Sequence, residues 1–326
     1  MAELTVTFLD VGWGDSILLE CVDDQGGHHF GLVDSNDTSS WPTSRVYLKR
    51  HFERYAAALP RAGCDAPART YPFFDFVVAS HAHADHVAGL QAVLRHFGTR
   101  ELLSPRFDRA NSAALSRLIA WARRATSRTR PVATLHRYLD RDSAIGFGPV
   151  NVTVLWPRPP LPGMHPPDEP NDLRNENNNS VVLQLELGSV RMVLTGDCQA
   201  ENWTRNPDNS WPIALPTAGL KLVQIPHHGA RNGLFDRAGG TPLIDQIAEL
   251  AANEKTVDPV LAVSCHPVPH KHPHPEVAAA LDRLGDKPAK FGSWAGTTRW
   301  LRTDRNLHFS VWTDGTKVET RARPAV

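Results

Sequence analysis

The chain has 326 residues, of which 41% are hydrophobic and 21% charged, so it is long enough for one large domain or two small ones and can bury a sizeable core. Its 35 Lys and Arg balance its 35 Asp and Glu, which excludes a globally basic nucleic-acid binder but leaves a local basic groove open. The composition also argues against a disordered, collagen-like or disulfide-framework protein, and the 16 histidines are a first indication of metal chemistry.

The N-terminus and the cysteines indicate the compartment. The chain does not open with a basic region followed by an apolar stretch, so we expect no secretory signal. No window reaches the roughly 18 consecutive apolar residues of a membrane span, so we expect no span. The four cysteines form no CxxC pair, which predicts reduced thiols and a cytoplasmic location. They are Cys21, Cys64, Cys198 and Cys265.

The first third of the chain is predicted to be rich in strands, because its apolar residues alternate or form short runs. A turn signal between Val11 and Asp15 separates the first two strands. The elements expected there, in chain order, are strands at 4–10, 16–22 and 29–34, a helix at 45–59 and a buried strand at 74–80.

In the rest of the chain, helices alternate with strands. A helix follows the strand at 74–80 and is expected to end at Gly98. Gly188 and Ser189 are predicted to turn a hairpin. The remaining elements, in chain order, are a helix at 110–126, strands at 150–156, 180–187, 190–195 and 220–225, a helix at 242–252, a strand at 259–264, a helix at 275–284, and strands near 298–301 and 307–313.

This alternation predicts an α/β fold in layers, with two sheets facing each other and helices outside. We find no internal repeat and no low-complexity linker, and the Pro-rich stretch 157–170 is too short to join two domains. We therefore expect one domain over residues 1–326, with the Pro-rich stretch forming a surface loop near the functional site.

A histidine cluster between a buried strand and a helix carries the strongest chemical signal. It reads His81-Ala82-His83-Ala84-Asp85-His86. Imidazole nitrogens and carboxylates are the ligands that zinc and similar ions take. The two-residue spacing points His81 and His83 to the same side, while Asp85 and His86 lie on the turn into the helix and can reach a second ion. A polar helix start with Asp85 near the first amides is the alternative, but so dense a cluster favours metal binding.

Three further donors follow apolar strands in the second half of the chain. Asp197 follows the strand at 190–195, where a carboxylate can bridge two cations, although alone it would be an ordinary Gly-Asp turn. His227 and His228 follow the strand at 220–225. Adjacent histidines point in different directions, so at most one is expected to bind metal directly, and the other to support the site or catalysis. A solvated pair on a loop is the alternative.

A third histidine-rich run occupies residues 265–274, again after an apolar strand. We expect His272 to lie in the active site, and a polar rim formed by this loop is the competing interpretation. The histidines outside these three runs are expected to be structural or on the surface. They are His28, His29, His51, His96, His136 and His308.

Together, the motifs resemble those of the metallo-β-lactamase superfamily. In chain order they are FLDVGWGDSILLE, LVDSN, SHAHADHVAGL, NNNSVVLQLELGSVRMVLTGD, VQIPHHGA and HKHPHPEV, and they extend from residue 5 to about residue 301. The HxHxDH element is specific to the superfamily, and the other elements are similar to the soluble metallo-hydrolase domain of ComEC-type competence proteins. Because the chain lacks the membrane channel segments of such proteins, we expect a stand-alone relative.

The resemblance implies a four-layer αββα sandwich with a dimetal site at one edge of the two sheets. The implied cofactors are two divalent metal ions, zinc or manganese. The implied ligands are His81 and His83 for the first ion, Asp85, His86 and His228 for the second, and Asp197 as the bridge.

The resemblance also extends to residues around the ligands. Many superfamily members carry a further His before the bridging Asp, whereas this chain has Asn177 in that region, as the ComEC-like branch does. The first ion is then held less tightly, or through Asn177 or water. Asp34 resembles the structural Asp beneath the metal site, and Asp10 and Asp15 are expected to brace nearby loops. Trp13 departs from the branch, which often has Gln there.

These residues predict a metal-dependent hydrolase. A metal lowers the pKa of bound water from about 15.7 to near 7, so hydroxide is available as the nucleophile. Asp85 is expected to orient that nucleophile, and His227 or His272 to protonate the leaving oxygen or to bind its charge. Asn177 and Ser180 are expected to contact a substrate oxygen.

The branch resemblance favours a phosphodiester substrate, either a nucleic acid or a nucleotide. Hydrolysis of a carboxylic ester, lactone or thioester is a second hypothesis, and a non-enzymatic, metal-stabilised binding or regulatory module is a third. Trp156, Trp203 and Trp211 suit either a base-stacking or an acyl pocket. Arginines near the helix at 110–126 support phosphate binding, although a solvated helix face is the alternative. They are Arg106, Arg109, Arg123, Arg124, Arg128 and Arg130.

Overall fold

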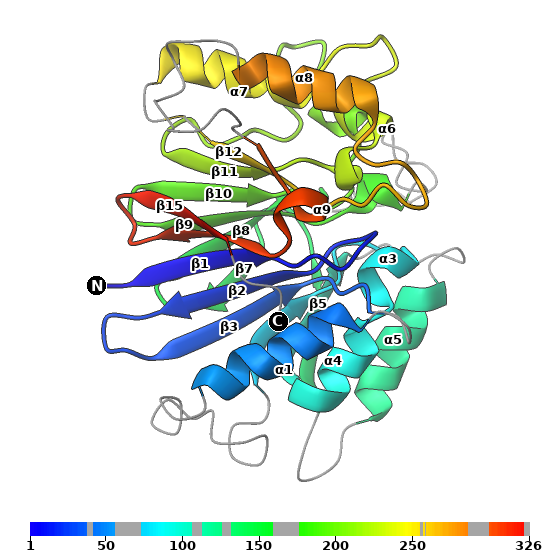
Figure 1. The fold of residues 1–326 in the computed structure, drawn as a ribbon, viewed down its shortest axis with the longest axis vertical. Helices are drawn as coiled ribbons and strands as arrows, with labels where there is room; N and C mark the ends of the chain where they lie inside the picture. Colours follow the sequence, from blue (N-terminus) through cyan, green and yellow to red (C-terminus); the bar gives the residue numbers. More distant parts are fainter. Residues whose placement is uncertain are drawn as a thin grey trace.

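The computed structural model describes residues 1–37, 42–55, 73–105, 113–125, 132–158, 176–254, 257, 259–285 and 300–322. In these ranges the chain forms two mixed β-sheets with helices on their outer sides (Figure 1). Most of the predicted Pro-rich loop, residues 159–170, lies outside the described residues. So do Cys64, Arg106, Arg109, Arg128 and Arg130.

The first sheet has eight strands within the described ranges, in the order β15-β14-β1-β2-β3-β4-β5-β6. Neighbouring strands run antiparallel from β15 to β3 and parallel from β3 to β6. Their bounds are β1 Glu3–Phe8, β2 Ile17–Val22, β3 His28–Val33, β4 Phe74–Val78, β5 Thr99–Pro105, β6 Ala133–Leu139, β14 Phe309–Thr313 and β15 Val318–Ala322.

The second sheet has seven strands in the same part of the chain, in the order β13-β12-β11-β10-β9-β8-β7. Strands β10 to β13 are parallel, and β7 to β10 are antiparallel. Their bounds are β7 Ala144–Phe147, β8 Val150–Trp156, β9 Val182–Leu187, β10 Val190–Leu194, β11 Leu220–Gln224, β12 Val260–Val263 and β13 Trp300–Arg302. The predicted hairpin is confirmed, because Leu187 pairs with Val190 across Gly188 and Ser189.

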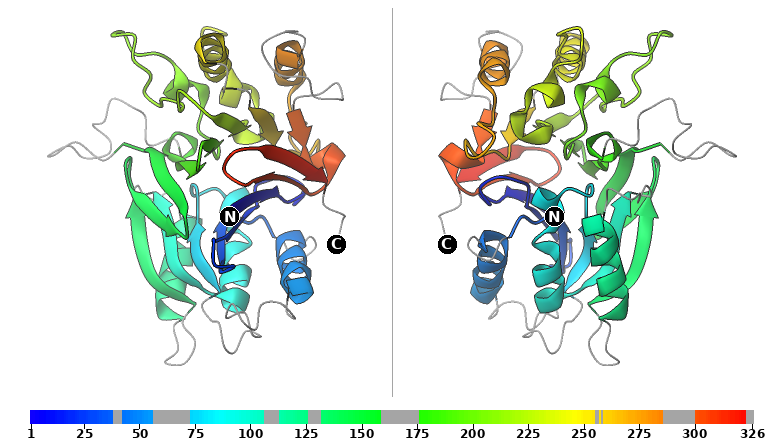
Figure 2. Two further views of the ribbon diagram at one scale, coloured as in Figure 1. Left: turned by 90° about the vertical axis from the view of Figure 1, so that its left-hand side faces the viewer. Right: turned by 90° about the vertical axis from the view of Figure 1, so that its right-hand side faces the viewer.

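Helices cover both outer sides of the two sheets. Helices α1, α4 and α5 lie against the first sheet, and α7 and α8 lie beyond the second (Figures 1 and 2). Across the described ranges, we find no helix with the length and apolar character needed to cross a bilayer. The helix bounds are α1 Thr43–Tyr55, α3 Ala84–Val87, α4 Leu90–Phe97, α5 Ala113–Arg124, α6 Arg231–Leu234, α7 Pro242–Asn253, α8 Pro275–Gly285 and α9 Thr303–Asn306, with 3-10 turns η3 Asn177–Asn179, η4 Ala200–Trp203 and η5 His227–Gly229.

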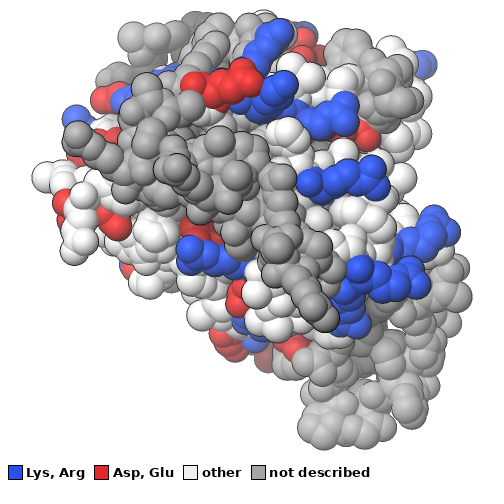
Figure 3. All heavy atoms as spheres, turned by 90° about the horizontal axis from the view of Figure 1, so that it is seen from below, with Lys and Arg blue, Asp and Glu red and all other residues white. Residues whose placement is uncertain are grey.

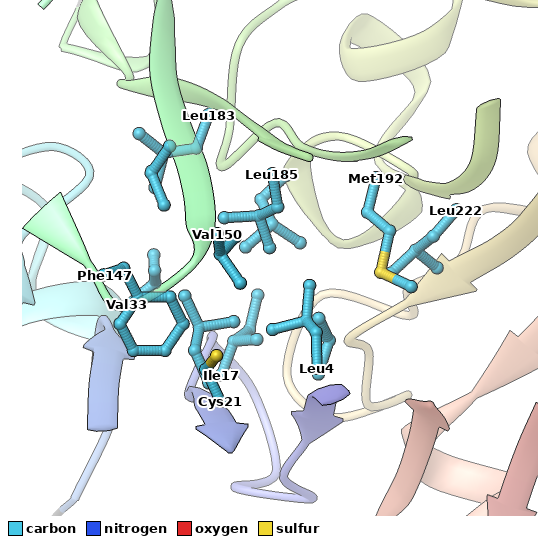
Figure 4. Packing of buried hydrophobic residues seen from close by; sticks show 14 of the residues in the cluster. Leu4, Ile17, Cys21, Val33, Phe147, Val150, Leu183, Leu185, Met192 and Leu222 are labelled. Carbon is cyan, nitrogen blue, oxygen red and sulfur yellow. The ribbon is translucent and has the colours of Figure 1, made fainter. Parts of the chain in front are cut away.

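Three apolar layers hold these elements together. The central layer lies between the two sheets and contains residues of both, such as Leu4 and Ile17 from the first sheet and Leu185 and Met192 from the second (Figure 4). The second layer joins the second sheet to α7 and α8, and the third joins the first sheet to α1, α4 and α5. The predicted αββα sandwich is therefore confirmed, whereas the single domain stays a prediction.

The single helix predicted after the histidine cluster is wrong, because two helices, α3 and α4, occupy that stretch. They separate at Gly89, whose backbone passes close to the loop after β3. A Cβ at Gly89 would lie 2.3 Å from Oγ of Ser35 and 2.5 Å from the backbone nitrogen of Asp37. The predicted end at Gly98 is confirmed, since its N–H donates to the carbonyl oxygen of Leu94 and its φ is 69°.

A buried carboxylate on β2, Glu20, lies between two histidines. Its Oε1 is 3.4 Å from Nδ1 of His28, and its Oε2 is 3.3 Å from Nε2 of His51. Burial alone would raise the pKa of Glu20, but the contacts with His28 and His51 outweigh burial and lower the pKa to about 2.

We expect Glu20→Gln to lower the free energy of unfolding at pH 7 by about 1–3 kcal/mol, because the partly buried His28 and the buried His51 lose their anionic partner. The usual pKa of Glu20 is 4.5, so its contribution is complete above that pH and is lost as the pH falls toward about 2. Urea unfolding at pH 7 and pH 3 measures this, and the difference between variant and parent should shrink at pH 3. The control is Glu53→Gln, because Glu53 pairs with Lys49 on the exposed surface of α1. This variant should change the free energy of unfolding by less than about 1 kcal/mol. Equal differences at both pH values would contradict the expectation.

Candidate metal centre

Polar side chains from both sheets meet where parallel strands end. Strand β4 leads into the run 81–86, β10 leads into Asp197, and β11 leads into His227 and His228. Among the described residues, two groups of side chains could each hold a metal ion. Within each group, the donor atoms all lie within 4.8 Å of one another. The first is His81, His83 and Asp197, and the second is Asp15, His86, Asp197 and His228.

The first group combines two histidines and one oxygen of Asp197. Nε2 of His81 lies 3.2 Å from Nδ1 of His83 and 3.6 Å from Oδ2 of Asp197. Nε2 of His227 approaches the same oxygen at 3.6 Å. His81 and Asp197 are buried, whereas the side chain of His83 is 41% exposed. The first group therefore meets solvent at His83.

The second group gathers around the other oxygen of Asp197. Nε2 of His86 lies 3.2 Å from Nε2 of His228, and Oδ1 of Asp197 is 3.3 Å from the former and 3.5 Å from the latter. Oδ2 of Asp85 is 3.3 Å from Nε2 of His228 and 3.7 Å from Nε2 of His86. Asp197 thus turns one oxygen toward each group, which is the arrangement of a bridging carboxylate.

The outward nitrogens of His86 and His228 already have partners. Nδ1 of His86 donates to Oδ2 of Asp34 at 2.7 Å, and Nδ1 of His228 donates to the carbonyl oxygen of Ser264 at 3.0 Å. These hydrogen bonds favour the tautomer whose Nε2 carries a lone pair, as a metal ligand requires.

Asp15 and Asp85 lie on opposite sides of these two rings. Asp15 faces the Nδ1 atoms, at 3.8 Å from His86 and 3.9 Å from His228. Asp85 faces the Nε2 atoms, where the lone pairs point. The tautomers therefore favour Asp85 over Asp15 as the carboxylate beside an ion on the Nε2 side.

Buried carboxylates give the centre a strong negative potential. Burial raises the pKa of Asp15. Burial would also raise the pKa values of Asp85 and Asp197, but the neighbouring histidines outweigh it and hold both below the usual range. Conversely, burial would lower the pKa values of His86 and His228, but the carboxylates raise the first well above its usual value and the second to about 9. The carboxylates of the centre thus stabilise positive charge, which a divalent cation can supply.

The donor set fits such a cation. Two nitrogens bound to one tetrahedral zinc at about 2.0–2.1 Å lie roughly 3.3 Å apart. The facing nitrogens of His81 and His83 lie 3.2 Å apart, as do those of His86 and His228. In addition, neither buried oxygen of Asp197 accepts a hydrogen bond from a described residue. Fully buried carboxylate oxygens ordinarily have partners, so their orientation toward both groups agrees with metal ligation.

The two histidines predicted to act in catalysis lie beside the donor groups. The ring of His272 is 6.1 Å from the rings of both His227 and His228. Its buried Nδ1 has no hydrogen-bond partner among the described residues. Burial and then the neighbouring histidines lower the pKa of His272 to about 3, so its ring is neutral at pH 7. Their catalytic roles stay predictions.

Asn177 and Ser180, predicted to contact substrate, lie at different depths. Nδ2 of Asn177 is 3.5 Å from Nε2 of His227, so its amide faces the centre. Ser180 is fully buried, and its Oγ accepts the backbone N–H of Asp197 at 3.2 Å. The observed contact of Ser180 therefore fixes the turn that carries Asp197, and its contact with substrate stays a prediction.

Several supporting residues were identified from the motifs, and others were missed. Asp34 lies beneath the centre, where it accepts the N–H and the Oγ–H of Ser80 at 2.7 and 2.6 Å. Gln224 was missed, although it accepts the backbone N–H of Thr195 at 2.9 Å and donates to Asp15 at 2.9 Å. An uncharged polar residue at the end of a mostly apolar strand was the available signal.

The tryptophan pocket considered from the sequence is not formed by Trp156 and Trp203. Both side chains are buried in the second apolar layer, where the indole N–H of Trp156 donates to the carbonyl oxygen of Asn178 at 2.6 Å. Trp211 packs beneath the guanidinium of Arg205, 4.1 Å from its ring centroid. Trp13 instead packs against His270, with ring centroids 4.7 Å apart.

Comparison with known proteins agrees with the resemblance. Residues 74–209 match the family model of the metallo-beta-lactamase superfamily. Over 306 residues, the chain is 23% identical to ComE operon protein 3 of Bacillus subtilis, which covers 94% of this chain and 32% of the relative. The chain therefore spans about a third of the length of that curated relative.

Solved structures to which this chain is similar include Igni18, described as a novel metallo hydrolase from the archaeon Ignicoccus hospitalis. It is 12% identical with a TM-score of 0.41, and the match covers 98% of this chain and 100% of Igni18. Another is MEM-A1, a subclass B3 metallo-beta-lactamase from a soil metagenome library. It is 14% identical with a TM-score of 0.35, and the match covers 76% of this chain and 94% of MEM-A1.

Proposed function

We propose that this chain, which belongs to the metallo-β-lactamase superfamily, a superfamily of metallo-hydrolases, is a metal-dependent phosphodiesterase acting on nucleic acid or a nucleotide. The proposed ligands are His81, His83 and one oxygen of Asp197 for the first ion. For the second ion they are Asp85, His86, His228 and the other oxygen of Asp197. The opposed orientation of the two Asp197 oxygens supports this assignment.

When bound, zinc or manganese would supply a Lewis acid and a water of lowered pKa. The residues of the chain then have separate tasks. Asp85 reaches from the second group and orients the attacking oxygen. Asn177 and His227 face the first group and hold a substrate oxygen by hydrogen bonds. His272, which is neutral at pH 7, donates a hydrogen bond to the leaving oxygen.

The observation that carries the phosphodiester substrate is a basic face on the three helices that cover the first sheet. Helices α1, α4 and α5 contain a single acidic residue, Glu53. Figure 3 views this side of the molecule, and basic side chains prevail over acidic ones across its right-hand part. A polyanion fits such a face better than an acyl substrate does. The exposed basic side chains on these helices are Arg45, Lys49, Arg50, Arg95, Arg117, Arg123 and Arg124.

The proposal is tested by assaying the purified protein with manganese or zinc against three substrates. These are bis-p-nitrophenyl phosphate, single-stranded DNA and a lactone. We expect both phosphodiesters to be cleaved and the lactone to remain intact. Faster cleavage of the lactone would instead support the ester hypothesis, and metal binding without any hydrolysis would support a non-enzymatic module.

Reversing charge on the basic face is expected to weaken binding of a single strand. In the triple variant Lys49→Glu, Arg50→Glu and Arg117→Glu, the slope of log K against log salt should become shallower by about 2, because each lost phosphate contact contributes about 0.7 for single strands. Fluorescence anisotropy with a labelled oligonucleotide and chelator measures binding without cleavage. Arg321→Glu on the edge strand β15 is the control and should leave the slope unchanged. An unchanged slope in the triple variant would show that the face does not bind the strand.

A further inference from the structure

His83 is oriented differently from the other proposed histidine ligands. His81, His86 and His228 turn Nε2 toward their neighbours in the groups, whereas His83 turns Nδ1 toward Nε2 of His81 at 3.2 Å. The side chain of His83 is also 41% exposed, whereas the other three histidines are buried. Little protein therefore packs around His83 to hold its ring in place.

Each of the other three rings has a partner on its outward nitrogen. Nδ1 of His86 meets Asp34, and Nδ1 of His228 meets Ser264, as described above. Nδ1 of His81 lies 3.1 Å from Oγ of Ser80. A histidine ligand whose outward N–H is bound has a fixed tautomer, a fixed ring orientation and greater basicity.

The outward nitrogen of His83 meets Glu176. Oε2 of Glu176 lies 3.1 Å from Nε2 of His83, and the side chain of Glu176 is only 17% exposed. Glu176 directly precedes the turn η3, which carries Asn177, so it comes from a different part of the chain than the cluster at 81–86. Glu176 was not among the site residues identified from the sequence.

We propose that Glu176 is a positioning residue, which accepts the Nε2–H of His83 and thereby directs the Nδ1 lone pair toward the first metal ion. The inference rests on the metal site of the proposed function but not on its substrate. Two imidazole nitrogens facing each other at 3.2 Å suit a shared cation only when both carry lone pairs. A carboxylate on the far side of His83 enforces that arrangement, because its oxygen accepts a hydrogen bond only when the proton of the ring is on Nε2.

The small donor set of the first group makes this contact more important. The first group has two histidines and one oxygen of Asp197 among the described residues, so its metal affinity depends strongly on each donor. The loss of such an outward partner typically weakens metal binding about 10–100-fold. Glu176 would therefore set the occupancy of the first site while touching neither the ion nor the substrate.

Two variants of Glu176 separate positioning from direct ligation. Glu176→Gln keeps an oxygen that can accept the Nε2–H, whereas Glu176→Ala removes it. We expect Glu176→Ala to weaken zinc binding at the weaker of two sites about 10–100-fold in chelator competition, and Glu176→Gln to weaken it less. Glu186→Gln is the control, because Glu186 is also partly buried but pairs with Arg191 at the far end of β9.

A second readout uses the metal-free protein. In ¹⁵N-histidine-labelled protein, the Nε2–H of His83 should give a proton signal protected from exchange with water, assigned by its disappearance in His83→Gln. The signal should be lost in Glu176→Ala and kept in Glu176→Gln and Glu186→Gln. If the signal is lost in Glu176→Ala and in neither of the Gln variants, Glu176 positions the ring of His83, whatever the substrate of the protein proves to be.

Two results would overturn the inference. Equal loss of zinc in Glu176→Gln and Glu176→Ala would make Glu176 a direct ligand. Unchanged zinc affinity and an unchanged His83 signal in Glu176→Ala would leave it without a role. Neither measurement involves hydrolysis, so failure to cleave phosphodiesters would count against the proposed substrate and leave this inference standing.

Discussion

Replacing Asp197 with Asn is expected to remove more metal and more activity than any other single change. Asp197 turns Oδ2 toward His81 and Oδ1 toward His86, so one substitution strips an anionic donor from both groups. We expect the metal content to fall from two ions to less than one per chain, and phosphodiester hydrolysis to fall about 10³-fold or more. Elemental analysis and steady-state rates measure the two effects.

The design of this experiment must separate chemistry from folding. Asn has nearly the shape of Asp, so the backbone N–H that reaches Ser180 keeps its partner. Circular dichroism of the variant should therefore match the parent. Asp245→Asn, an exposed carboxylate in the first turn of α7, is the matched control and should retain both metal and activity. Two bound ions in Asp197→Asn would refute the bridging role.

The layered fold could be predicted because most strands of the core are short apolar runs with clear turns between them. The hairpin at Gly188 and the helix α7 follow such local signals. Strands β5, β6, β7 and β15 were not predicted. Five of the seven residues of β6 are not buried, so an edge strand such as this one lacks the apolar alternation that marks a half-buried strand.

The site was predictable to the extent that its donors occur in compact motifs. The run 81–86 and Asp197 lie at strand ends, and the topology of two sheets brings these ends together. The supporting contacts were less visible. Glu176 reaches His83 and Gln224 reaches Asp15 across long stretches of chain, and no spacing within the sequence encodes such distances.

The backbone conformation at the site was also not predictable from the sequence. Asp34, His227 and His228 all have positive φ values, of 59°, 51° and 54°, which residues other than glycine rarely adopt. This geometry lets two adjacent histidines diverge, so that Nε2 of His228 faces the second group while Nε2 of His227 faces the first. The sequence left open which histidine binds metal, because the answer depends on these angles.

The pair His228→Ala and His272→Ala is expected to separate a metal ligand from a hydrogen-bond donor. Nε2 of His228 lies within 3.5 Å of His86, Asp85 and Asp197, so its loss should empty the second site. Excess metal should then restore part of the activity. His272 lies beside His228 with its ring nearly parallel at 6.1 Å, and its buried Nδ1 has no hydrogen-bond partner within the described part of the chain. Its loss should leave the metal content unchanged.

The two variants should also differ in how their activity depends on the leaving group. His272 is proposed to stabilise the leaving oxygen, and removing one such donor costs about 10²–10³ in kcat. A nitrophenolate leaves readily and needs little stabilisation, so His272→Ala should cleave bis-p-nitrophenyl phosphate almost as well as the parent does and DNA far more slowly. His228→Ala should lose both activities alike, because its defect is in metal binding. Metal content and both rates, measured for each variant, decide the assignment. If His272→Ala loses metal while His228→Ala retains it, the roles are reversed, and the loop 265–274 supplies a ligand to the centre.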